Sequence, residues 1–182
     1  MTEDCDGRHA ATITRLPFRS VNRRGRPGYN PGLQRHHLIP RQAMRASCLA
    51  PMFDCLGRAR IGMDDFRRNG LLLPSREEVA ARMLLPLHRG PHRQYNEMVL
   101  DRLGGIERRW VRGKGQWSSR AAVAALERLG RLQRRLAAEL LDHRRPIRLN
   151  RHCRLGLGTD FTALDALADQ LWETTDQSTQ RR

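Results

Sequence analysis

The stretch Gln34-Arg35-His36-His37-Leu38-Ile39-Pro40 decides how the rest of this chain is interpreted. An adjacent histidine pair is followed by a short apolar segment that a proline closes, which is typical of a strand end or an extended turn. In an extended segment, neighbouring side chains point to opposite faces, so the two imidazoles are not expected to serve one ion equally. One of them can bind a metal ion while the other points to a water molecule at the substrate.

A second histidine pair, His88-x-x-x-His92, lies further along the chain. Two imidazoles four residues apart can face the same way across one helical turn, so their neutral nitrogens can clamp one divalent ion. Pro91 suits the first turn of such a helix. A single histidine is more often structural than catalytic, but two pairs in one basic chain favour hydrolysis of a phosphodiester bond. That reaction needs a base for water and a cation for the phosphate charge.

The charge of the chain indicates a polyanionic partner. The formal net charge is +15 and the sequence pI is about 11.4. Clustered cations gain free energy by displacing counterions from phosphates, so nucleic acid is the leading candidate. All but one of the basic residues are arginine, the exception being Lys114, and the base composition of a genome can also produce that bias.

Hydrophobic patterning predicts short elements followed by longer helices. We expect a strand end at the first histidine pair, short helices and loops after it, and a long amphipathic helix late in the chain. The other expected elements are a turn at Asn69-Gly70 feeding a buried strand at Leu71-Leu72-Leu73-Pro74, a helix from Pro91 to Gly104-Gly105, a basic loop over residues 108–115, and the long helix from Ser118 or Ser119 to about His143.

Three blocks of this sequence, taken together, resemble the AHH subfamily of HNH/endonuclease VII-like nucleases, which are ββα-metal or His-Me finger enzymes. The resemblance covers residues 33–141, and Arg35 stands where the family name has a small residue. The blocks are Gln34-Arg35-His36-His37-Leu38-Ile39-Pro40, Met63-Asp64-Asp65 with Asn69-Gly70-Leu71-Leu72-Leu73-Pro74, and Leu87-His88-Arg89-Gly90-Pro91-His92-Arg93-Gln94-Tyr95-Asn96. The resemblance implies an α+β fold, mostly helical, in which helices surround a small ββα-metal core.

The resemblance also implies a role for each site residue. His37 is the general base, and His36, His88 and His92 bind one catalytic divalent ion, for which Mg, Mn, Ni and Zn are the candidates. Asn69 is the middle letter of HNH and fixes the loop by hydrogen bonding. The expected activity is that of an endonuclease acting on DNA or RNA. The alternative is a module that binds nucleic acid on the same metal-stabilised fold without cutting it.

We expect three regions: a basic flexible arm over residues 1–31, the nuclease domain with its bracing helix over 32–143, and an extension with one amphipathic helix over 144–182. No apolar run is long enough to cross a bilayer, and the acidic start Met1-Thr2-Glu3-Asp4 lacks the features of a signal peptide. The predicted location is therefore the cytoplasm, or export as an effector without a cleavable signal. The family resemblance adds the expectation of a bacterial toxin with an immunity protein as partner.

Overall fold

The structure, a computed structural model, describes residues 15–113, 118–144, 147 and 149. The described chain is mostly helical with one small antiparallel sheet, so the predicted α+β fold is confirmed. The amphipathic helix expected after residue 144 falls outside the described residues. The elements in chain order are η1 (Phe18–Ser20), β1 (Leu33–His37), η2 (Arg41–Arg45), α1 (Ala50–Leu56), α2 (Arg58–Ile61), α3 (Phe66–Asn69), β2 (Gly70–Pro74), α4 (Glu77–Met83), α5 (Arg93–Arg112) and α6 (Ser118–Leu141).

The sheet consists of β1 and β2, which pair antiparallel with His36 opposite Leu71 and His37 opposite Gly70. The predicted strand after Asn69-Gly70 is confirmed, although Asn69 ends the short helix α3 rather than forming an isolated turn. The ring of Phe66 occupies the space that a Cβ atom at position 70 would need. A glycine is therefore required where α3 passes directly into β2.

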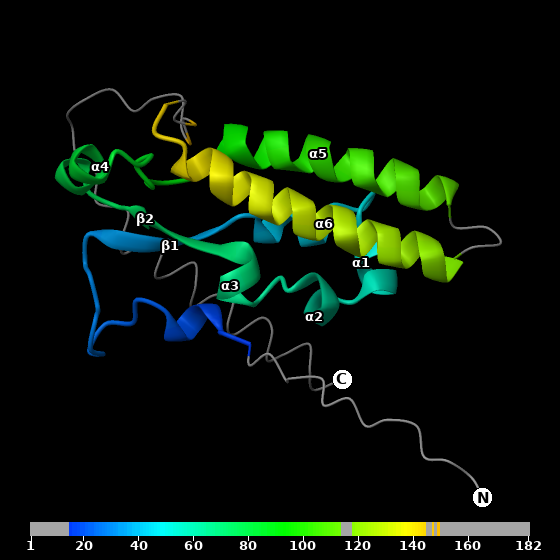
Figure 1. Cartoon of the computed structure of the whole chain (residues 1–182), viewed down its shortest axis with the longest axis horizontal. Coiled ribbons are helices and arrows are strands. Elements are labelled where there is room, and N and C mark those ends of the chain that lie inside the picture. Colours follow the sequence, from blue (N-terminus) through cyan, green and yellow to red (C-terminus); the bar gives the residue numbers. More distant parts are fainter. Residues whose placement is uncertain (1–14, 114–117, 145–146, 148, 150–182) are drawn as a thin grey trace, which may run out of the picture.

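The two long helices lie side by side, and the sheet, α2 and α3 lie below them in the view of Figure 1. Each long helix turns a stripe of apolar side chains inward at helical spacing. Burial of one large apolar side chain contributes roughly 1.5–3 kcal/mol, so this pair supplies much of the core. The buried residues are Tyr95, Val99, Leu103, Ile106 and Trp110 on α5 and Ala125, Leu129, Leu132, Leu136 and Leu140 on α6.

The length of α5 differs from the sequence prediction. The helix was expected to end at Gly104-Gly105, with a loop over residues 108–115, but it continues to Arg112. A glycine inside a helix costs roughly 1 kcal/mol relative to alanine. Ile106 and Trp110 continue the buried stripe beyond the glycines, and burial of these two side chains outweighs that cost.

Residues 15–31 belong to the segment predicted to be a basic arm, and they contact the core. The backbone amide of Phe66 donates to the carbonyl oxygen of Leu16 at 2.7 Å, and Asp65 Oδ1 accepts from the amide of Leu16 at 3.2 Å. Asp65 also caps α3 by accepting from the amide of Arg67. The sequence pattern missed these contacts because hydrogen bonds to backbone groups produce no hydrophobic period.

The side-chain amide of Asn69 joins three parts of the fold. Asn69 is fully buried; its Nδ2 donates to the carbonyl oxygens of Ile39 and Met63, both at 3.1 Å, and its Oδ1 accepts from the amide of Ile39 at 2.8 Å. Gln133 Nε2 on α6 also donates to Asn69 Oδ1, at 3.4 Å. Asn69 thus connects the segment that follows β1, the segment before α3, and helix α6.

Replacing Asn69 with alanine should destabilise the protein by about 3 kcal/mol or more. The change leaves buried backbone groups of Ile39 and Met63 without partners, and each such group costs roughly 1–3 kcal/mol. Asn96→Ala is the matched control, because the side chain of Asn96 donates to Gln42 at an exposed position, and its loss should cost no more than about 0.5 kcal/mol. Urea unfolding measures both free energies, and equal losses would contradict the structural role of Asn69.

Candidate active site

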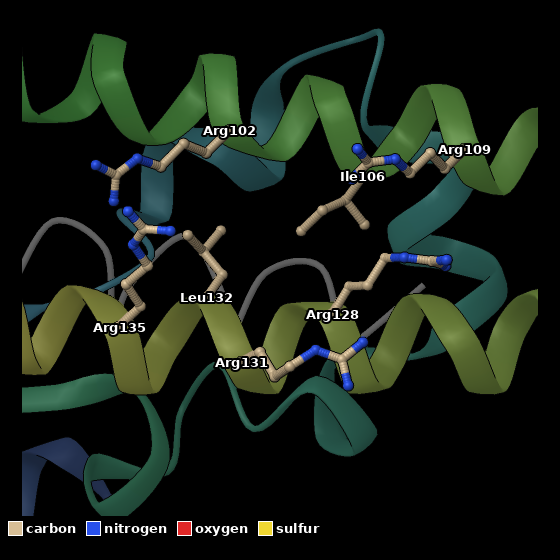
Figure 2. A pocket seen from close by; sticks show the side chains of 7 residues that line it. All are labelled: Arg102, Ile106, Arg109, Arg128, Arg131, Leu132 and Arg135. Atoms are coloured by element: carbon tan, nitrogen blue, oxygen red, sulfur yellow. The ribbon is translucent and has the colours of Figure 1, made fainter.

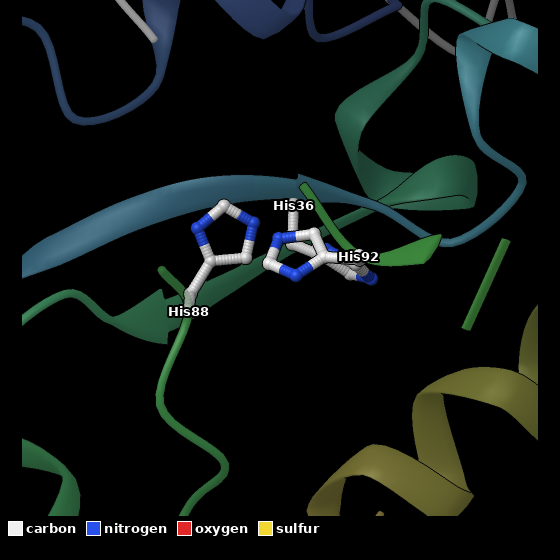
Figure 3. A group of neighbouring side chains, drawn as sticks. All are labelled: His36, His88 and His92. Carbon is white, nitrogen blue, oxygen red and sulfur yellow. The ribbon is translucent and has the colours of Figure 1, made fainter. Parts of the chain in front are cut away.

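Three of the predicted site histidines converge in the structure, namely His36, His88 and His92. One ligand nitrogen from each lies within 4.8 Å of the others, and the ring centroids of His88 and His92 are 4.3 Å apart. Figure 3 shows His36 projecting from β1 towards the other two, which come from the segment that leads into α5. The sequence prediction that these three side chains lie together is consistent with this arrangement.

His88 precedes α5, as expected for a helix that begins near Pro91, and His92 is the N-cap of that helix. The two imidazoles therefore meet across the helix start and not across one turn inside the helix. Gly90, at φ 66°, turns the chain between them in a conformation that favours glycine. The amide of His88 donates to the carbonyl oxygen of Pro74 at 2.6 Å, which attaches this loop to the end of β2.

The electrostatics of the cluster suit a cation. His36 is 3 % exposed and His88 8 % exposed. Burial, reinforced by the neighbouring histidines, lowers the pKa of His36 well below its ordinary value and the pKa of His88 to about 3. Both imidazoles are therefore neutral, the form that binds metals. His36 Nε2 is buried without a hydrogen-bond partner, and a divalent ion would satisfy such an atom.

Gln34 orients His88 within the cluster. Gln34 Oε1 lies 2.9 Å from His88 Nδ1, so the imidazole donates from Nδ1 and keeps the lone pair of Nε2 available. Tyr95 packs against His36 with ring centroids 4.8 Å apart, and its hydroxyl donates to the carbonyl oxygen of Leu38 at 2.8 Å. Burial raises the pKa of Tyr95, so the hydroxyl keeps its proton. Sequence reasoning did not single out Gln34, because one polar residue on a strand carries no pattern.

His37 is not part of the three-histidine cluster, although it is next to His36 on β1. Its ring stacks on Phe18, with centroids 3.8 Å apart and planes 2° from parallel. Arg35 Nη1 donates to the carbonyl oxygen of Phe18 at 3.0 Å, so the residue that departs from the family name helps to hold this ring. Burial, followed by the charges of Arg41 and Arg35, lowers the pKa of His37 to about 3. The imidazole is therefore neutral and able to accept a proton.

Asn69 and the acidic residues of the second block lie outside the cluster. The carbonyl oxygen of Asn69 accepts from the amide of Leu38 at 2.8 Å, directly after His37, so Asn69 acts on the site through the backbone. Asp64 is 42 % exposed and forms an ion pair with Arg15 at 3.1 Å. Within the described residues, the only group of three or more potential metal ligands is the histidine cluster.

The AHH family, a nuclease family of the HNH/ENDO VII superfamily with conserved AHH, matches residues 17–133 of this chain. The chain belongs to the AHH family. The matched region contains the three-histidine cluster, His37, Asn69 and the segment around Phe18, so the resemblance stated from the sequence is confirmed. No curated protein and no solved structure matches the chain.

Membership of the AHH family makes the chain a nuclease, and its substrate class is nucleic acid. Nucleases of the HNH type depend on a metal ion, and the donor set of the cluster fits that requirement. None of the helices in the described part of the chain is long and apolar enough to cross a membrane.

In this AHH protein, Gln34→Ala should allow the imidazole of His88 to adopt either neutral tautomer. Without the Oε1 acceptor, the metal-free imidazole is expected to populate both neutral tautomers instead of the one protonated at Nδ1. Long-range ¹H–¹⁵N NMR correlations of the histidine rings distinguish the two forms. Gln42→Ala is the control, because Gln42 is exposed and its side chain accepts from Asn96 and not from His88. A single Nδ1-protonated form that persists in Gln34→Ala would show that Gln34 does not set the tautomer.

Proposed function

We propose that this protein is a metal-dependent nuclease in which His36, His88 and His92 bind one divalent ion and His37 is the general base. The observation that carries the proposal is the convergence of three ligand nitrogens within 4.8 Å, directly beside a fourth histidine on the same strand. An ion held there neutralises charge on the phosphate and stabilises the departing oxygen of the cleaved bond. The ligand residues hold their positions through β1, the hydrogen bond from the amide of His88 to the carbonyl oxygen of Pro74, and the start of α5.

The donor set favours a transition metal over magnesium. All three potential ligands are imidazoles, which suit zinc, nickel and related ions, whereas magnesium prefers oxygen ligands and retains its water. The burial of His36 and its unpartnered Nε2 supports the same conclusion, because neutral nitrogen atoms need no proton removed before they bind an ion. Among the four candidate metals, nickel and zinc are therefore preferred.

His37 fits the role of base by its position and its surroundings. Residue alternation along β1 directs its ring away from the side on which His36 lies, so it stays out of the ligand set. Stacking on Phe18 restricts rotation of the ring. Besides burial, Arg41 and Arg35 lower the pKa of His37 in the free protein, and a phosphate bound by their guanidinium groups would offset that effect. The neutral imidazole can then take the proton from an attacking water molecule.

Asn69 serves this site as a positioning residue. Its buried amide fixes Ile39, and its carbonyl oxygen fixes Leu38, so the two residues after His37 are held to the start of β2. That constraint fixes the backbone next to His37 and therefore the direction of the His37 side chain. The toxin role and the immunity-protein partner stay predictions from the family resemblance, and export remains an alternative to the cytoplasm.

His88→Ala should weaken the binding of Mn²⁺, Ni²⁺ or Zn²⁺ by at least about tenfold, because one of three ligands is lost. His143→Ala is the control: His143 is exposed and its ring contacts the carbonyl oxygen of Leu84, outside the cluster. Isothermal titration of metal-free protein measures both affinities. If the two variants bind each metal equally well, the ion does not sit on His88.

His37→Ala should leave metal affinity unchanged while cleavage of plasmid DNA or of a structured RNA falls by about a hundredfold or more, the usual contribution of a general base. The assay compares wild type and variant in EDTA and after each metal is restored. Loss of metal from His37→Ala would place His37 among the ligands. Tight binding by wild type without cleavage under any metal would favour the alternative, a binding module that does not cut.

A further inference from the structure

Helices α5 and α6 leave a groove between them that lies away from the histidine cluster. Its volume is about 570 Å³. Two apolar residues form part of its lining, and all the others are arginines (Figure 2). The lining residues are Arg102, Ile106, Arg109, Arg128, Arg131, Leu132 and Arg135. Five guanidinium groups along one groove indicate an anionic ligand.

The positive charge is only partly neutralised. Glu139 accepts from Arg102 at 2.7 Å and from Arg135 at 2.8 Å, and the exposed Arg131 approaches Glu127 at 3.7 Å. Burial raises the pKa of Glu139, but the hydrogen bonds from both arginines outweigh it and lower the pKa overall, so this carboxylate stays ionised. One end of the groove is thereby paired within the protein.

The other end keeps its charge for a ligand. Figure 2 shows Arg102 and Arg135 at one end of the groove and Arg109 and Arg128 at the opposite end. Within the part of the chain that the structure describes, no carboxylate forms an ion pair with Arg109 or Arg128. These two side chains need no internal bond broken before they contact an external anion.

The spacing of the arginines suits a phosphate chain. Arg102 and Arg109 lie about two helical turns apart on α5, as do Arg128 and Arg135 on α6, so each row extends about 10 Å. One strand of duplex DNA places a phosphate every 3.4 Å or so along the helix axis, so each row covers about three phosphates. One guanidinium group can also bind two phosphate oxygens at once through parallel N–H donors, which the ammonium group of lysine does not do.

We propose that this groove binds the phosphodiester backbone of the nucleic acid at a distance from the site of cleavage. The inference rests on the proposed nuclease function for the identity of the ligand. Helix α5 joins the two sites: His92 caps its start, and Arg102 and Arg109 follow about 15 Å and about 25 Å along it. The groove therefore contacts phosphates beyond the scissile one and contributes to affinity rather than to the chemical step. An acidic protein surface is the competing ligand.

The test compares Arg109→Ala/Arg128→Ala with wild type in the full chain. Binding of a labelled duplex and of a labelled single strand is measured by fluorescence anisotropy in EDTA over a range of NaCl concentrations. The groove variant should bind more weakly, and the slope of log Kobs against log salt should fall by about 2 in magnitude for the duplex, since each phosphate contact contributes about 0.9. Arg109→Lys/Arg128→Lys should recover most of the slope because the charges remain.

Arg108→Ala/Arg134→Ala is the matched control, because it removes two exposed arginines from the same helices outside the groove. This pair should change the slope much less. Equal effects of the two pairs would mean that net charge alone governs binding, and the proposal would be wrong. Wild-type binding by the groove variant would also overturn it and would leave an acidic protein as the ligand. Because EDTA prevents cleavage, the result does not depend on whether the proposed catalysis is correct.

Discussion

The buried amide of Asn69 is the interaction on which the site depends. A short two-stranded sheet has little stability of its own, because few cross-strand contacts oppose the entropy of two flexible chains. Asn69 compensates by bonding both backbone groups of Ile39 and the carbonyl oxygen of Met63, and Gln133 bonds it in turn from α6. Helix α6 is thus connected directly to the segment that carries His36 and His37.

Strand alternation then places the side chains of neighbouring residues in different surroundings. On β1, His36 is buried against Tyr95 and the two histidines before α5, while His37 stacks on Phe18. A loop could not keep adjacent side chains on opposite sides with the same fidelity, because its backbone dihedral angles vary more. His36 and His37 lie on a strand and His92 lies at a helix start. These regular elements allow a small core to position four imidazoles.

The sequence allowed prediction of the parts that depend on residue identity or on strong periodicity. The histidine pairs, the strand after Gly70 and the apolar stripe of α6 are of that kind, and the family match confirmed the resemblance drawn from them. The missed features depend on three-dimensional context. Helix α5 continues past Gly104 and Gly105 because Ile106 and Trp110 are buried after them. Phe18 stacks on His37 through contacts that leave no pattern in the sequence.

In the proposed function, different parts of this protein carry the chemical step and the attraction of the substrate. Burial keeps the imidazoles of His36 and His88 neutral, so without a bound ion these two side chains add no positive charge that could attract a polyanion. The net charge of +15 therefore acts from elsewhere, through arginines on the surface and in the groove between α5 and α6. Added salt screens those exposed charges far more than it perturbs a buried site. Ionic strength should consequently govern the affinity for nucleic acid, while burial and hydrogen bonding determine the protonation state and the orientation of the imidazoles.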